Sequence, residues 1–113
     1  MIGEKSFAFS VRIVRLCKIL QEDRREHIMS RQLLRAGTSI GANVTEAKQG
    51  QSRADFISKN SIALKEASET AYWLRLLHAT DYLNDQEYQS ICQDCQELEK
   101  ILTSIIKTAK DPD

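Results

Sequence analysis

Apolar residues recur at helical spacing in four stretches of this chain, and short polar segments separate the stretches. The first stretch has the 4-3-4 spacing of one helical face, formed by Phe9, Ile13, Leu16 and Leu20. The last stretch is spaced 3, 4, 3, 4, 3, 4 and consists of Tyr88, Ile91, Cys95, Leu98, Leu102, Ile105 and Ala109. That spacing is typical of a narrow seam between helices. The whole pattern predicts helices over residues 5–21, 30–48, 53–80 and 85–109.

The middle of the second predicted helix consists mostly of residues with small side chains. Its apolar face consists of Leu33, Gly37, Ile40, Val44 and Ala47. A glycine inside a helix costs roughly 1 kcal/mol relative to alanine, so two of them need a compensating contact. We therefore expect a neighbouring helix to pack very close against Gly37 and Gly41. Ser30 is the expected N-cap of this helix.

The third predicted helix carries apolar residues around most of its circumference. Its main stripe consists of Ile57, Leu64, Ala67, Ala71, Leu74 and His78. A second group, well away from that stripe, consists of Tyr72, Trp73 and Leu76. A helix of a four-helix monomer needs only one apolar face, so we expect another subunit to cover part of this helix.

The remaining local signals favour an all-α fold. The only proline is Pro112, and helix-forming residues dominate the chain before it. Two N-cap signals, Ser52 with Asp55 and Asn84 with Glu87, precede the last two helices. Four helices joined by short turns predict an antiparallel up-down-up-down four-helix bundle that occupies residues 1–113 as one domain.

Charge and hydropathy restrict where the protein is expected to act and which partners it is expected to bind. No apolar run approaches the roughly 20 residues that span a bilayer, and nothing resembles a signal peptide, so we expect a cytoplasmic protein without a membrane partner. The formal net charge is zero, but residues 1–53 hold ten Lys and Arg against five Asp and Glu. A basic first half leaves phosphate contact open, through Arg12, Arg15, Lys18, Arg24, Arg25 and Arg31. Overall neutrality argues against strong nucleic-acid binding.

Residues capable of catalysis or metal binding are few. Cys92 and Cys95 form a lone CxxC, and no second pair of metal-ligand residues accompanies it. His27 and His78 have no evident catalytic partner in the sequence. We therefore predict no metal, no cofactor, no small-molecule substrate and no enzymatic activity.

Polar residues of the second and third helices allow two interpretations. Glu66 and Glu69 could perform acid–base work, but with Lys65 they are better explained as ion pairs that set helix register or meet Arg35 or Arg75. Asn43 and Glu46 lie within one turn of each other. If buried, they could hydrogen-bond to the third helix; if exposed, they are ordinary surface residues.

Two separated motifs resemble one protein family. The first runs from Ser30 to Glu46, SRQLLRAGTSIGANVTE, and the second from Asp55 to Leu74 contains DFI, IALKEA, ET and YWL. Together they are similar to the signatures of the bacterial four-helix-bundle proteins named after intervening sequences in 23S ribosomal RNA genes. The matching polar or aromatic positions are Arg35, Asn43, Glu46, Lys65, Glu66, Glu69 and Trp73.

The resemblance implies a four-helix protomer that assembles into a ring-like homopentamer, and it supplies no reaction. A related branch, the accessory proteins of diversity-generating retroelements, is strongly basic and works with RNA, whereas this chain is neutral. We therefore expect a self-assembling, non-enzymatic interaction scaffold whose oligomer and structural candidates are the seven matching residues with Tyr72 and Leu76. The alternative is an RNA- or ribonucleoprotein-associated factor that uses the basic first half.

Overall fold

A computed structural model describes residues 1–111 of the chain, and these residues form four helices and no strand. The helices are α1 (Ile2–Glu22), α2 (Met29–Lys48), α3 (Arg53–Ala79) and α4 (Asp85–Lys110). The all-α, four-helix prediction is confirmed. Helix α1 begins three residues earlier than expected, because Ile2 packs against the core despite the glycine that follows it. No helix in the described part of the chain is long and apolar enough to cross a membrane.

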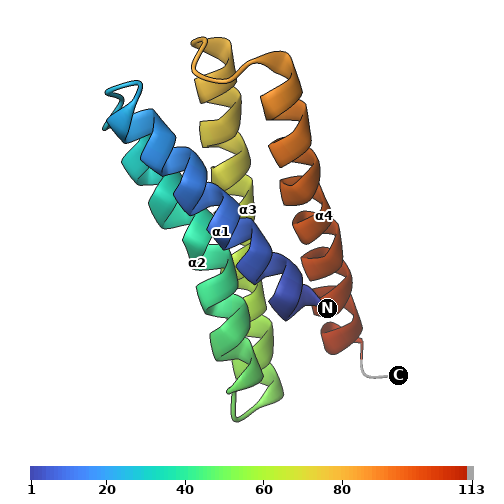
Figure 1. Ribbon diagram of the computed structural model, residues 1–113. Coiled ribbons are helices and arrows are strands. Elements are labelled where there is room, and N and C mark those ends of the chain that lie inside the picture. The colour runs from blue at the N-terminus through green and yellow to red at the C-terminus, as the bar shows by residue number, and fades with distance from the viewer. Residues whose placement is uncertain (112–113) are drawn as a thin grey trace.

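Helices that follow one another in the chain pack against each other, and α1 crosses in front of α2 and α3 in Figure 1. Helices α1 and α3 both contact α2 and α4, and the body measures 49 × 22 × 20 Å. In Figure 1 the first and third connections lie at the upper end and the second at the lower end. Helix α1 follows α2 more closely than it follows α4, and α1 and α4 separate toward the upper end.

Helix α1 packs against the small residues in the middle of α2, as the glycine pattern predicts. A Cβ atom added at Gly37 would lie 2.9 Å from the side chain of Ile13. One added at Gly41 would lie 3.1 Å from the Ser10 hydroxyl and 3.3 Å from the Ser6 carbonyl oxygen. These distances leave no room for a larger side chain without displacement of α1. The cost of two helical glycines is therefore offset by close helix packing.

The start of α2 differs from the prediction. Ser30 lies inside the helix and is buried, and Ile28 at the N-cap makes no side-chain cap. The cap is the Glu26 carboxylate, which accepts hydrogen bonds from the backbone N–H groups of Ile28, Met29 and Ser30 at 2.7–3.0 Å. Burial opposes ionisation of this carboxyl, but the N–H donors outweigh it and lower the pKa of Glu26. The prediction of Ser30 as the N-cap is therefore wrong, because a glutamate outside the usual N-cap position carries no local sequence signal.

The buried stripe of α3 also differs from the prediction. Its fully buried residues are Asn60, Ala63, Ala67, Thr70, Leu74 and Leu77, whereas Ile57, Leu64, Ala71 and His78 are only half-buried. Asn60 Nδ2 and Thr70 Oγ1 donate to the carbonyl oxygens four residues earlier, Phe56 and Glu66, so burial leaves neither group unpaired. A polar side chain that hydrogen-bonds to its own helix can be buried in the core. A prediction that rests only on the spacing of apolar residues does not include such side chains.

The N-caps of the last two helices and the α4 seam agree with the prediction. Ser52 Oγ accepts from the Asp55 N–H at 3.0 Å, and Asn84 forms a reciprocal capping box with Glu87. Along α4 the seam is buried at its centre, and its ends Tyr88, Ile105 and Ala109 are half-buried. In α1 the buried row is Ser6, Phe9, Ile13, Cys17 and Leu20, so Cys17 replaces the predicted Leu16, which is half-buried.

Replacement of Gly37 by leucine tests the close approach of α1 and α2. We expect Gly37→Leu to lower the free energy of unfolding by about 1–3 kcal/mol, because the new side chain overpacks against Ile13. The matched control is Ala42→Leu, at an exposed position of the same helix. Urea denaturation of both variants measures the difference, and equal stability would contradict close packing at Gly37.

Replacement of Glu26 by glutamine tests the cap of α2. A carboxyl whose pKa is lowered on folding contributes stability above its unfolded pKa and loses it as pH falls through the folded pKa. We expect Glu26→Gln to cost about 1–2 kcal/mol at pH 7 and to flatten the loss of stability on acidification below the ordinary glutamate range.

The control for this cap is Glu22→Gln, at an exposed residue near the end of α1. Denaturation at pH 7 and at pH values below the ordinary glutamate range compares the two variants with the wild type. A Glu26→Gln protein with wild-type stability and pH dependence would show that the carboxylate does not support α2.

Candidate interaction surface

A cluster centred on Arg35 joins α2 to α3. The Arg35 guanidinium donates to Glu66 Oε2 at 2.9 Å and also to Glu69 Oε2. The Glu66 side chain is 12% exposed and that of Arg35 is 49% exposed, so the cluster lies at the edge of the core. The sequence left two interpretations of these carboxylates, and the structure places both in ion pairs with Arg35.

Trp73 extends the cluster along α3. Its indole Nε1 donates to Glu69 Oε2 at 3.1 Å. The Trp73 and Arg35 hydrogen bonds, followed by the positive charge of Lys65, lower the pKa of Glu69. The hydrogen bond to Glu69 raises the pKa of Arg35 in turn. A carboxylate held in its charged form by two donors is poorly suited to accept and release a proton near neutral pH.

Apolar side chains project beside this cluster. Tyr72 is 51% exposed, and its ring meets the Trp73 ring edge-on with centroids 5.0 Å apart. Ile62, about three turns earlier on α3, is also exposed, whereas Trp73 and Leu76 are half-buried. We call the outward-facing surface formed by Arg35, Ile62, Glu69, Tyr72, Trp73 and Leu76 the α2–α3 surface.

The other predicted residues on α2 and α3 are Asn43, Glu46 and Lys65, and they differ in the contacts that they make. Asn43 is half-buried, and its Nδ2 donates to the Ser39 carbonyl of its own helix, so the suggested bond to α3 is replaced by a local one. Glu46 does reach α3, through an ion pair of 3.1 Å with Lys59. Lys65 is exposed and makes no ion pair within residues 1–111, although its charge acts on Glu69. Lys59 was not among the predicted residues, because it lies between the matched segments DFI and IALKEA of the second motif.

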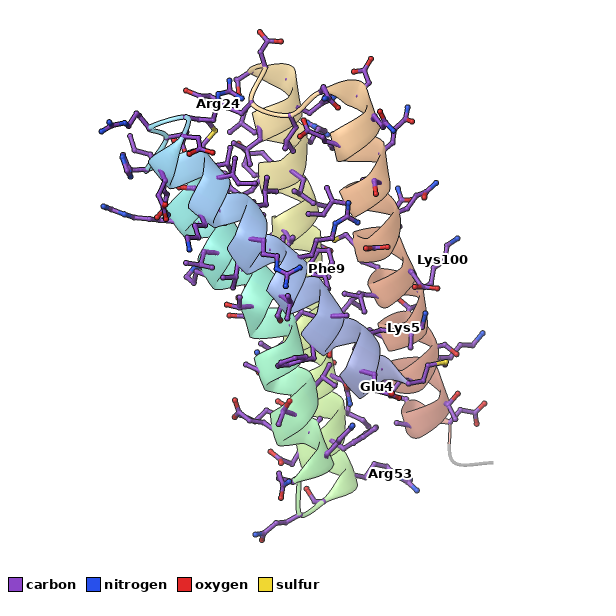
Figure 2. The ribbon with its side chains drawn as sticks, viewed as in Figure 1. Glu4, Lys5, Phe9, Arg24, Arg53 and Lys100 are labelled. Carbon is purple, nitrogen blue, oxygen red and sulfur yellow. The ribbon has the colours of Figure 1, made fainter. Side chains whose placement is uncertain are left out.

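Two of the basic residues form cross-links at the α1–α4 side. The Arg12 guanidinium donates to Asp94 at 2.8 Å and to Ser90 at 2.7 Å. Arg24 donates to the carbonyl oxygens of Tyr82 and Asp81, both at 3.2 Å, and its guanidinium lies over the Tyr82 ring. Figure 2 places Arg24 at the upper end, between the first turn and α3, and Lys5 between α1 and α4.

Four of the predicted nucleic-acid residues remain exposed without an ion-pair partner in the described part of the chain. They are Arg15, Lys18, Arg25 and Arg31. Arg15 and Lys18 lie on α1, Arg25 lies in the first turn and Arg31 lies on α2. They are therefore spread over one end of the bundle rather than gathered with aromatic residues.

Two of the cysteines, Cys17 and Cys95, and one histidine, His78, have structural roles. Cys17 and Cys95 are buried, and burial raises the pKa of each thiol to about 12. His78 Nε2 lies 2.7 Å from Asp85 Oδ1, and its ring stacks on that of Tyr88 at a centroid distance of 4.2 Å. Residues 1–111 contain no group of three His, Cys, Asp or Glu side chains placed to hold a metal ion.

Comparison with known proteins agrees with this architecture. A crystal structure from Bacteroides thetaiotaomicron VPI-5482, of a protein with unknown function from the S23 ribosomal protein family, is 56% identical. It matches with a TM-score of 0.94 over 96% of this chain and 100% of its own. No curated protein matches this chain significantly. The sequence model of the 23S rRNA-intervening sequence proteins matches residues 1–104, and the resemblance carried by the two motifs is thereby confirmed. The chain belongs to the 23S rRNA-intervening sequence protein family, whose function is unknown.

Proposed function

We propose that this protein is a non-enzymatic, self-assembling antiparallel four-helix bundle that acts in the cytoplasm as an oligomeric interaction scaffold. The observation that carries the proposal is the α2–α3 surface, where exposed Tyr72 and Ile62 flank a fixed Arg35 cluster. The homopentameric ring implied by the family resemblance is the assembly that we propose.

The composition of this surface supports a protein–protein contact. Tyrosine, tryptophan and arginine are the residues that most often dominate the energy of protein interfaces. Here Trp73 and Arg35 are already held by hydrogen bonds to Glu69, so little side-chain freedom remains to be lost on binding. An exposed Tyr72 ring resting on that fixed base offers a rigid apolar contact.

A non-enzymatic role agrees with the state of the reactive groups. Glu66 and Glu69 are occupied by Arg35. The buried thiols of Cys17 and Cys95 have pKa values of about 12, so they stay protonated and weakly nucleophilic at neutral pH.

The RNA-binding alternative has less support. Arg12 and Arg24 are engaged in contacts with α4 and the third turn, so they are not free to meet phosphates without breaking those contacts. The four remaining basic residues are not interleaved with an exposed aromatic platform on which bases could stack.

Assembly is tested by mass. The protomer has a mass of 12.9 kDa, and we expect light scattering of the wild type at micromolar concentration to give five times that value. Tyr72→Asp should reduce the oligomer to protomers with an unchanged helical circular dichroism spectrum, because Tyr72 is half exposed and contributes little to the core.

Gln93→Asp is the control for this measurement, since Gln93 is exposed on the outer face of α4. It should leave the mass unchanged. A wild-type protein with the mass of one protomer would refute self-assembly. A Tyr72→Asp protein with the full oligomer mass would show that Tyr72 does not lie in the interface.

RNA binding is tested separately. We expect no salt-dependent mobility shift of a structured RNA at low ionic strength, because the free basic residues are few and dispersed. A shift that weakens with salt and disappears in an Arg15→Ala/Lys18→Ala double variant would instead favour the RNA-associated function.

A further inference from the structure

A ring needs a second contact surface on each copy, and the identity of that surface rests on the self-assembly proposed above. Because α1 and α3 each lie between α2 and α4, the α1–α4 side of the bundle is opposite the α2–α3 surface. Two copies can meet through like surfaces, or through two different ones in a head-to-tail contact. The shapes on the two sides decide between these arrangements.

The α1–α4 side is hollowed. A groove of about 190 Å³ lies between the two helices, and the residues that line it are Arg12, Leu16, Ile19, Leu83, Glu87 and Ile91. Leu83 and Ile91 belong to the buried core and form its apolar floor, while Ile19 is 51% exposed at its edge. Arg12 connects α1 to α4 at this groove, and Arg24 connects the first turn to the third turn.

The α2–α3 side carries a protruding apolar residue. Ile28 is 79% exposed, more than any other large apolar residue of the described chain. It immediately precedes α2 and has helical backbone angles. Arg31 and Arg35 follow Ile28 by three and seven residues, so the three side chains lie on one helical face. Because Arg35 on that face contacts α3, Ile28 extends the α2–α3 surface toward the first turn.

Charge favours contact between these two sides. Arg25 and Arg31, on either side of Ile28 in the sequence, are exposed and make no ion pair within residues 1–111. At the groove, Arg12 is paired with Asp94, whereas the exposed Glu87 carboxylate accepts, within residues 1–111, only the Asn84 N–H. The basic residues around the protruding isoleucine are thus complementary to a groove whose Glu87 carboxylate makes no ion pair within residues 1–111, and unlike charges at an interface promote correct pairing.

We infer that Ile28 of one copy inserts into the α1–α4 groove of the next copy, with the α2–α3 surface lying along the same contact. A protrusion matched to a hollow on the opposite side produces a head-to-tail interface. Such an interface closes into a ring when the rotation between copies is suitable. The groove is therefore a docking site for a second copy of this chain.

Paired variants at the two sides test this arrangement. Ile28→Asp removes the protrusion, and Ile19→Asp places a charge at the groove; both residues are exposed, so we expect wild-type melting temperatures. Each variant alone should lose assembly and run at the protomer mass. An equimolar mixture should form a species of twice that mass, because one intact protrusion meets one intact groove and no further contact is possible.

Phe7→Asp is the control, since Phe7 is exposed beside a different groove, between α1 and α2, and should leave the oligomer intact. If Ile19→Asp lowers the melting temperature, Ile19→Gln replaces it in the same mixing experiment. Loss of assembly in Phe7→Asp, or a mixture that stays at the protomer mass, would overturn the proposed docking.

Wild-type assembly separates this inference from the proposed function. A wild-type protein at the protomer mass would refute self-assembly itself. A wild-type oligomer that neither Ile28→Asp nor Ile19→Asp disturbs would refute only this pair of surfaces.

Discussion

The close approach of α1 to α2 is the constraint on which the other helix positions depend. Gly37 and Gly41 let Ile13 and the backbone near Ser6 come within van der Waals distance of α2. Helix α1 therefore follows α2 along its length and diverges from α4 toward the upper end. The α1–α4 side is left with a shallow groove and polar cross-links. The opposite side, between α2 and α3, is packed and carries the Arg35 cluster.

Much of this architecture could be predicted from the sequence because the relevant forces are local. Helix periodicity, the Ser52 and Asn84 caps and the glycine pair each involve residues within a few turns of one another. The centre of the α3 stripe could not be predicted, because that helix is apolar on most sides and its core includes Asn60 and Thr70. Their polar groups are hydrogen-bonded to carbonyls of the same helix. The hydropathy of a side chain does not indicate whether it can make such a bond.

The candidate surface was predicted in part, for a similar reason. Glu66, Glu69 and Trp73 lie within two turns of α3, so their proximity follows from helix geometry. Arg35, the shared partner of Glu66 and Glu69, lies more than thirty residues earlier, and the sequence indicates it only as one of two possible partners. The contacts of Arg12, Arg24 and Lys59 depend on how the helices are placed in space. Those residues appeared in the sequence only as positive charge, or were missed.

The ion pairs between α1 and α4 make the contact between these two helices sensitive to ionic strength. Lys5–Glu97 and Arg12–Asp94 are ion pairs between side chains that are 39–54% exposed, and dissolved salt screens such pairs. The α1–α2 contact is made by buried apolar atoms at Gly37, which salt does not weaken in this way. Dissolved salt therefore weakens part of the contact between α1 and α4, whereas it leaves the apolar contact of α1 with α2 at Gly37 unchanged.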